Sequence, residues 1–155
     1  MKALYALLTA LLLATSFAAA QQSPAAAAAA LHQRADTAKG TDCVRLSMQA
    51  ARQDLEDADH YFVAGDAKAA HAAIDLSLHY ARRSVDCSLQ FHKGEKHAEI
   101  DLRTLIRRTK DVMQTLDSED RHHLAQSLAE LEKQRDRLLR GIFGPAVGDT
   151  PEKKP

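Results

Sequence analysis

The chain has 155 residues, with 21 basic and 21 acidic residues, no Trp and only 5% aromatic residues. This balanced charge argues against a general nucleic-acid-binding protein, which usually carries a basic stripe. The length supports one domain with a single core. Because that core must be built mainly from Leu, Ala, Ile and Val, packed helices are favoured over a β-sandwich.

The N-terminal segment has the pattern of a cleavable secretory signal. Lys2 supplies a short positive region, an apolar run follows over 3–14, and the small residues Ala18 and Ala20 end the segment. The run is shorter than the ~20 residues that span a bilayer comfortably. We therefore expect cleavage of residues 1–20 and no stable membrane insertion afterwards. The remaining chain would carry 20 basic and 21 acidic residues, a formal charge of −1, and would be periplasmic or secreted.

Two segments flank the predicted core. Residues 21–41 are rich in alanine and lack an amphipathic pattern, so we expect a flexible linker there. Residues 145–155 are rich in Gly, Pro and charge, which is typical of a disordered tail. The folded domain is then expected over residues 42–144.

Within this domain, apolar residues recur at helical spacing in four stretches, and no strand pattern competes with them. The first stretch runs over about 42–64, with apolar positions four and three residues apart, as on one face of a helix. The others run over about 66–92, 95–116 and 118–140. Helices of this length joined by very short turns pack antiparallel to their neighbours. The sequence thus predicts an all-α, antiparallel four-helix bundle built from two helical hairpins.

The two cysteines lie symmetrically about the first predicted turn. Cys43 and Cys87 are each 22 residues from Gly65. An antiparallel hairpin therefore puts both thiols at the same height, about 33 Å from the turn at 1.5 Å per residue. In an exported chain with two cysteines this favours a disulfide. Two buried thiols, or a redox or metal role, are the alternatives, although the chain has no Cys-x-x-Cys motif.

The stretch AGDAKAAHAAIDLSL resembles a tetratricopeptide-type helical hairpin. The Gly65-Asp66 corner, the small Ala70 and the bulky Ile74 occupy positions typical of that repeat. The usual aromatic residue after the corner is an alanine here, and no second copy is visible. The resemblance covers about residues 58–84 and implies a single hairpin of a scaffold that binds another protein.

The segment over 99–144, EIDLRTLIRR to RLLRGIFG, has a second likeness. It is similar to the C-terminal half of uncharacterised exported helical proteins from environmental bacteria. This resemblance implies a bacterial envelope setting and supplies no activity.

Seven histidines lie in the predicted helical region. Four of them approach the bundle end where the first turn and the last connection meet: His60, His71, His122 and His123. Imidazole beside carboxylate ligands suits zinc or copper. However, no His-x-x-x-His pair occurs within a helix, and the di-metal bundle pattern, which needs a Glu-x-x-His motif on each of two helices, is missing. Solvated polar helix ends are the favoured interpretation and no cofactor is expected; a periplasmic zinc- or copper-binding bundle is the alternative function.

Motifs of catalysis are missing from the sequence. There is no nucleophile elbow, no glycine-rich phosphate loop and no zinc-protease pair. We therefore expect a non-catalytic exported protein that binds an unknown envelope or secreted protein, or supports the envelope structurally. The candidate partner surface is the solvent face of the first hairpin around Tyr61, His71, His79 and Tyr80. Homodimerisation through the second apolar stripe of the second helix, which contains Leu76, is a further hypothesis.

Overall fold

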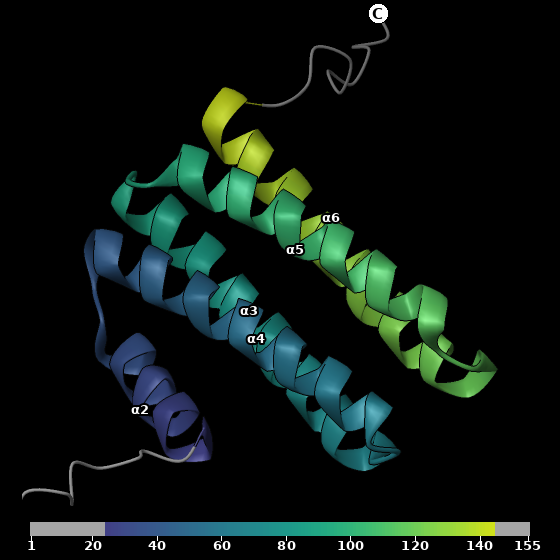
Figure 1. Ribbon diagram of the computed structural model, residues 1–155. Helices are drawn as coiled ribbons and strands as arrows, with labels where there is room; N and C mark the ends of the chain where they lie inside the picture. Colours follow the sequence, from purple (N-terminus) through teal and green to yellow (C-terminus); the bar gives the residue numbers. More distant parts are fainter. Residues whose placement is uncertain (1–23, 145–155) are drawn as a thin grey trace, which may run out of the picture.

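The computed structural model describes residues 24–144, and all the regular structure of these residues is helical. Five helices follow one another along the chain (Figure 1): α2 (Pro24–Thr37), α3 (Gly40–Val63), α4 (Ala67–Phe91), α5 (Glu95–Thr115) and α6 (Ser118–Phe143). The prediction of an all-α fold is therefore confirmed. The expected signal segment, 1–20, and the expected tail, 145–155, lie outside the described residues.

Helix starts and turns coincide with capping residues in the sequence. Asp66 caps α4 by accepting a hydrogen bond from the Ala69 amide at 3.0 Å, and Asp117 caps α6 through two amides of its first turn. Gly65 and Gly94 adopt φ of 77° and 72° in the turns after α3 and α4. These left-handed conformations favour glycine, which has no Cβ. Each of these turns is short enough to reverse the chain at once.

The four longer helices form two hairpins that lie side by side (Figure 1). The first hairpin is α3 with α4, and the second is α5 with α6. The first hairpin contacts the second through α4 and α6 and through α3 and α5.

Ion pairs show the direction of these contacts, because residue numbers rise together on the two paired helices. Between α4 and α6 the pairs are His71 with Asp120, Arg82 with Glu130, and Asp86 with Arg137. Between α3 and α5 they are Arg52 with Asp101 and Glu56 with Arg108. Each hairpin is antiparallel internally, but α4 therefore runs parallel to α6 and α3 parallel to α5.

This order differs from the expected bundle. A four-helix bundle with up-down-up-down neighbours would pair every helix with antiparallel partners, whereas the two hairpins here pack through parallel pairs. A fifth helix is also present. The short turns dictate that each hairpin is antiparallel, but they do not dictate how one hairpin packs on the other.

Helix α2 corrects the expectation of a flexible linker over 21–41. Residues Pro24–Thr37 are helical and lie against α3, on the side of the first hairpin away from α5 and α6 (Figure 1). Ala35 is fully buried and Leu31 is partly buried. Alanine has the highest helix propensity, and its small side chain leaves no amphipathic pattern in the sequence. The folded domain therefore extends over at least 24–144.

The first hairpin is closely packed along its length. Alanines on both helices are fully buried, including Ala51 and Ala81. Buried hydroxyls also link the two helices: Ser77 on α4 donates to the Ala51 carbonyl at 2.7 Å, and Ser84 donates to the Val44 carbonyl at 2.9 Å. Small side chains and satisfied hydroxyl groups thus let the two helices approach closely.

A disulfide between Cys43 and Cys87 closes the open end of this hairpin, which confirms the prediction from their spacing. Their Cα atoms are 6.1 Å apart, and both residues are buried. The bond joins residues 44 apart in the sequence. It therefore removes much of the freedom that the unfolded chain would have.

We expect replacement of both cysteines by alanine to lower the free energy of unfolding by about 4 kcal/mol, the loop entropy for a link of this length. Urea unfolding followed by circular dichroism at 222 nm measures the difference. A reducing agent should destabilise the wild-type chain by a similar amount and leave the Cys43→Ala/Cys87→Ala variant unchanged. Equal unfolding midpoints for the oxidised and reduced wild-type chain would contradict this prediction.

Candidate functional site

A buried polar cluster lies where α2 crosses the first hairpin. The Nε2 atom of His32 on α2 is 2.8 Å from Oδ1 of Asp54 on α3. The same imidazole stacks on the ring of Tyr80 on α4, with centroids 4.8 Å apart. Asp54 and Tyr80 are only 2% and 4% exposed. One side chain of α2 therefore contacts both helices of the hairpin.

Arg83 on α4 holds the carboxyl end of α2. Its Nε donates to the Ala35 carbonyl at 3.2 Å, and its Nη2 donates to the Asp36 carbonyl at 2.6 Å. The last carbonyls of a helix lack intrahelical partners and carry the negative end of the helix dipole, so a cation is favourable there. Polar contacts at two points thus attach α2 to the hairpin.

Burial dominates the electrostatics of this cluster. Burial raises the pKa of the Asp54 carboxyl to about 6, although the neighbouring His32 opposes the shift by its charge and its hydrogen bond. Burial, and then the nearby Asp36, raise the pKa of the Tyr80 hydroxyl to about 12. The second carboxyl oxygen of Asp54, Oδ2, is buried and has no hydrogen-bond partner among residues 24–144. An unused acceptor therefore lies beneath α2.

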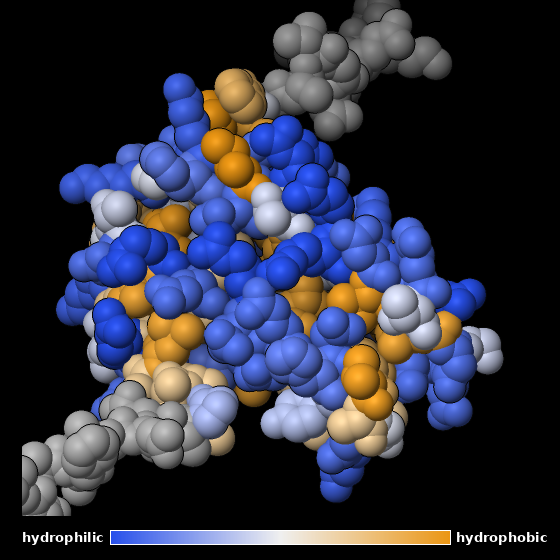
Figure 2. Space-filling view, in the orientation of Figure 1, coloured by the Kyte–Doolittle hydropathy of each residue, from blue (hydrophilic) through white to orange (hydrophobic). Residues whose placement is uncertain are grey.

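Large side chains are also exposed on the first hairpin. Tyr61 on α3 and Leu76 on α4 are each 42% exposed. His79 is exposed too, and its ring meets that of Tyr80 edge to face, with centroids 5.0 Å apart. Figure 2 shows apolar residues gathered in separate patches among hydrophilic ones on the face in view. We call Tyr61, Leu76 and His79 the first-hairpin surface.

The candidate partner surface from the sequence is therefore only partly exposed. Tyr61 and His79 face solvent, as expected. Tyr80 does not: it is buried beneath His32, because α2 covers this part of the hairpin. His71 lies instead against α6, so it is not part of the same face.

Two of the four candidate metal ligands meet between α4 and α6. The rings of His71 and His123 stack with centroids 4.2 Å apart. The Nε2 of His71 is 2.9 Å from Oδ1 of Asp120, and that of His123 is 3.4 Å from Oδ1 of Asp75. Both Nε2 atoms are buried, and neither makes an aligned hydrogen bond. Each imidazole thus faces a carboxylate of the opposite helix.

The other two histidines do not join this pair. His60 is exposed on α3. His122 forms a hydrogen bond within its own helix, with its Nε2 atom 3.0 Å from the side-chain nitrogen of Gln126. Within residues 24–144, no three His, Cys, Asp or Glu side chains are placed where they could hold one metal ion. The structure therefore brings together half of the proposed ligand set.

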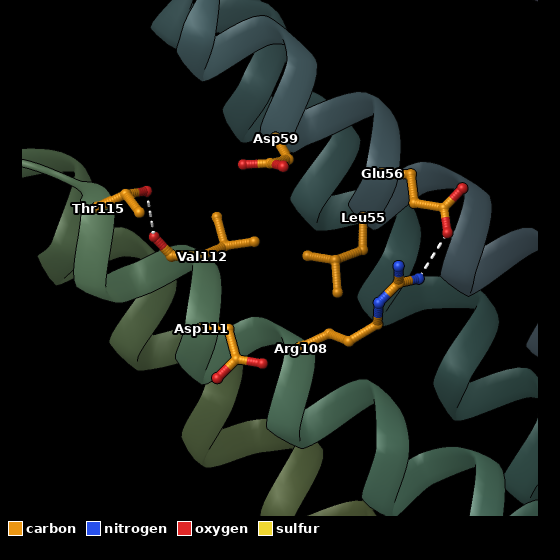
Figure 3. A pocket seen from close by; sticks show the side chains of 7 residues that line it. All are labelled: Leu55, Glu56, Asp59, Arg108, Asp111, Val112 and Thr115. Atoms are coloured by element: carbon orange, nitrogen blue, oxygen red, sulfur yellow. Dashed lines mark hydrogen bonds and ion pairs between the residues drawn. The ribbon is translucent and has the colours of Figure 1, made fainter.

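An acidic cleft of about 280 Å³ opens between α3 and α5 (Figure 3). The apolar side chains of Leu55 and Val112 lie between the two helices, and Asp59 and Asp111 approach the cleft from opposite sides. Arg108 is the one cation of the lining, and it pairs with a glutamate on α3. The cleft is open to solvent. The one hydroxyl group of its lining, that of Thr115, donates to the Val112 carbonyl of the same helix rather than to a side chain that could act as a base.

A second cleft, of about 510 Å³, lies between α5 and α6, and its α5 side carries three basic residues, Arg103, Arg107 and Lys110. Lys110 bonds Glu132 at 2.8 Å, and Arg135 bonds Glu99 at 3.0 Å. Arg103 lies 3.5 Å from the same Glu99. Carboxylates of the same two helices therefore neutralise much of this positive charge.

The chain matches no protein-family model, no curated protein and no solved structure. None of the helices over 24–144 combines the length and apolarity that crossing a bilayer requires.

Three residues of the polar cluster between α2 and the first hairpin were not identified from the sequence: His32, Asp54 and Arg83. The sequence feature that indicated a buried polar cluster was the position of Asp54, three residues after Ala51 and four before Ala58, on the buried face of α3. A carboxylate on an apolar helix face needs a buried partner. Nothing in the spacing indicated that this partner lies in the alanine-rich segment.

We expect the raised pKa of Asp54 to make stability depend on pH. Between pH 3.8, the usual pKa of an aspartate, and pH of about 6, the Asp54 carboxyl is protonated in the folded chain and ionised in the unfolded chain. Stability from this group is therefore fully present below pH 3.8 and is lost as the pH rises through about 6. The shift corresponds to a loss on the order of 3 kcal/mol.

Asp54→Asn is the matched control, because the amide keeps the shape and the acceptor for His32 but does not titrate. Urea unfolding at intervals from pH 4 to 7 should show the wild-type chain losing stability relative to this variant as the pH rises. Parallel pH profiles for the two proteins would show that the Asp54 proton is not linked to folding.

Proposed function

We propose that the protein is a non-catalytic, exported helical module that binds another protein through the first-hairpin surface. The observation that carries this proposal is the exposure of Tyr61 and Leu76, each 42% exposed, on the hairpin that α2 partly covers. Tyrosine is enriched in protein interfaces, where its ring is buried and its hydroxyl stays paired. His79 of this surface contacts Tyr80, which in turn stacks on His32 of α2.

The packing order of the hairpins supports a binding role. Two hairpins packed side by side, with corresponding helices parallel, is the arrangement by which helical-repeat proteins build extended binding surfaces. Such stacks need a terminal element that covers the outer face of the last unit. Helix α2 lies in the position of such a cap, on the outer side of the first hairpin.

The disulfide supports export. Structural disulfides persist in oxidising compartments and are rare in the reducing cytosol, and Cys43 and Cys87 are joined and buried. Together with the secretory pattern of residues 1–20, this favours a periplasmic or secreted location. The zinc- or copper-binding alternative is not proposed, because only His71 and His123 of its four ligands meet and each already faces a carboxylate.

Site-specific photocrosslinking in the producing cell tests the proposed function. A benzophenone amino acid at Leu76 should give one discrete adduct of a partner protein. The same group at Ala129, which is exposed on α6, should give none. An adduct at twice the mass of the chain would identify a second copy as the partner. Absence of any adduct at position 76, or identical adducts at both positions, would contradict a partner surface on the first hairpin.

A further inference from the structure

We propose that the face of the first hairpin beneath α2 is a helix-binding site, and that α2 is its exchangeable resident. The partner is an amphipathic helix with a basic side chain opposite Asp54 and apolar side chains larger than alanine beside it. This inference rests on the proposed protein-binding function and names the chemistry of the partner.

The first reason is that the side chains of α2 are shallowly buried. Ala35 is the only fully buried residue of α2. The helix is connected to α3 by a linker of two residues, Ala38 and Lys39. Its 14 residues make a helix that is marginal in water on its own. The helix therefore depends on the hairpin, while the disulfide-linked hairpin has its own packed interface.

The second reason is that α2 does not fill the space available to it. A cleft of about 400 Å³ remains between α2 and α3, lined by alanines and Leu31 on one side and by Gln49 and Gln53 on the other. Ala27 lines this cleft and lies one turn before Leu31. A helix with a larger apolar side chain at this position would exclude more water from the same face.

The third reason is the unused acceptor beneath α2. His32 reaches only Oδ1 of Asp54, and the buried Oδ2 has no partner. An imidazole donates from one nitrogen in this geometry, whereas a guanidinium presents two parallel N–H groups that match both oxygens of a carboxylate. An arginine from an incoming helix would therefore satisfy the group that α2 leaves unpaired.

The fourth reason is that apolar side chains remain exposed on the same hairpin. Leu76 lies one turn before Tyr80 on α4, and it is exposed whereas Tyr80 is covered. Tyr61 on α3 is exposed as well. A partner helix with apolar side chains larger than those of α2 would bury more of this surface, which joins the helix-binding site to the first-hairpin surface.

A labelled peptide tests this proposal on the full chain. The probe is a fluorescent synthetic peptide of residues 24–38 that carries Ala27→Leu and His32→Arg, and fluorescence anisotropy measures its Kd. The matched control peptide carries Ala27→Leu and His32→Glu. We expect the arginine peptide to bind the His32→Ala chain at least tenfold more tightly than the wild-type chain, because the resident helix is then weakened. The glutamate peptide should not bind either chain.

Two further variants separate loss of the site from loss of the fold. Leu31→Ala removes an apolar contact of the resident α2 and leaves the hairpin unchanged, so it should also tighten binding of the peptide, which keeps Leu31. Asp54→Ala should abolish binding while circular dichroism shows unchanged helicity of the hairpins. No saturable binding to either loosened chain, or equal binding of the glutamate peptide, would overturn the proposal. If the peptide fails while the Leu76 crosslink persists, only the helix-binding site is wrong; loss of both also removes the proposed function.

Discussion

The α3/α4 hairpin is the constraint on which the rest of the structure depends. Its two helices approach closely because their contacts are made by alanines and by buried serine hydroxyls that bond the facing carbonyls. The turn at Gly65 closes one end, and the disulfide closes the other. Every other helix then packs on this unit: α2 and α5 on α3, and α6 on α4.

The two sides of this hairpin carry different polar contacts. Towards the second hairpin, apolar contacts are joined by cross-helix ion pairs and by the stacked His71 and His123. Towards α2, the apolar contacts of Leu31 and Ala35 are joined by polar contacts that include the buried Asp54. A buried carboxylate costs free energy unless it is fully paired, and Asp54 is paired at one oxygen only. This incomplete pairing is what an arginine from the proposed partner helix would complete.

The sequence was informative where side chains repeat at regular spacing. The apolar pattern predicted the four longer helices to within a few residues, since capping residues such as Asp66 and Asp117 mark where they begin. The equal distances of Cys43 and Cys87 from Gly65 predicted the disulfide, because an antiparallel hairpin places such residues at one height. These are local or symmetric relations, which a single sequence can express.

Other features depend on contacts that have no local signal. Helix α2 was missed because alanine gives no amphipathic pattern, and its docking depends on His32 meeting Asp54 across 22 residues. The parallel pairing of the hairpins was missed because short turns constrain only neighbours in the chain. The meeting of His71 with His123 at the expected end followed from the hairpin geometry, but their stacking and their carboxylate partners depend on how α4 packs on α6.

The central claim is that α2 is a separately opening helix seated on a stable hairpin. Hydrogen–deuterium exchange of the full chain, read by mass spectrometry at peptide resolution, tests it most directly. Amides of α2 should exchange by local opening far faster than those of α3 and α4, and Arg83→Ala should accelerate exchange in α2 alone. Protection of α2 equal to that of α3 and α4 would contradict the claim, because α2 would then open only when the whole domain unfolds.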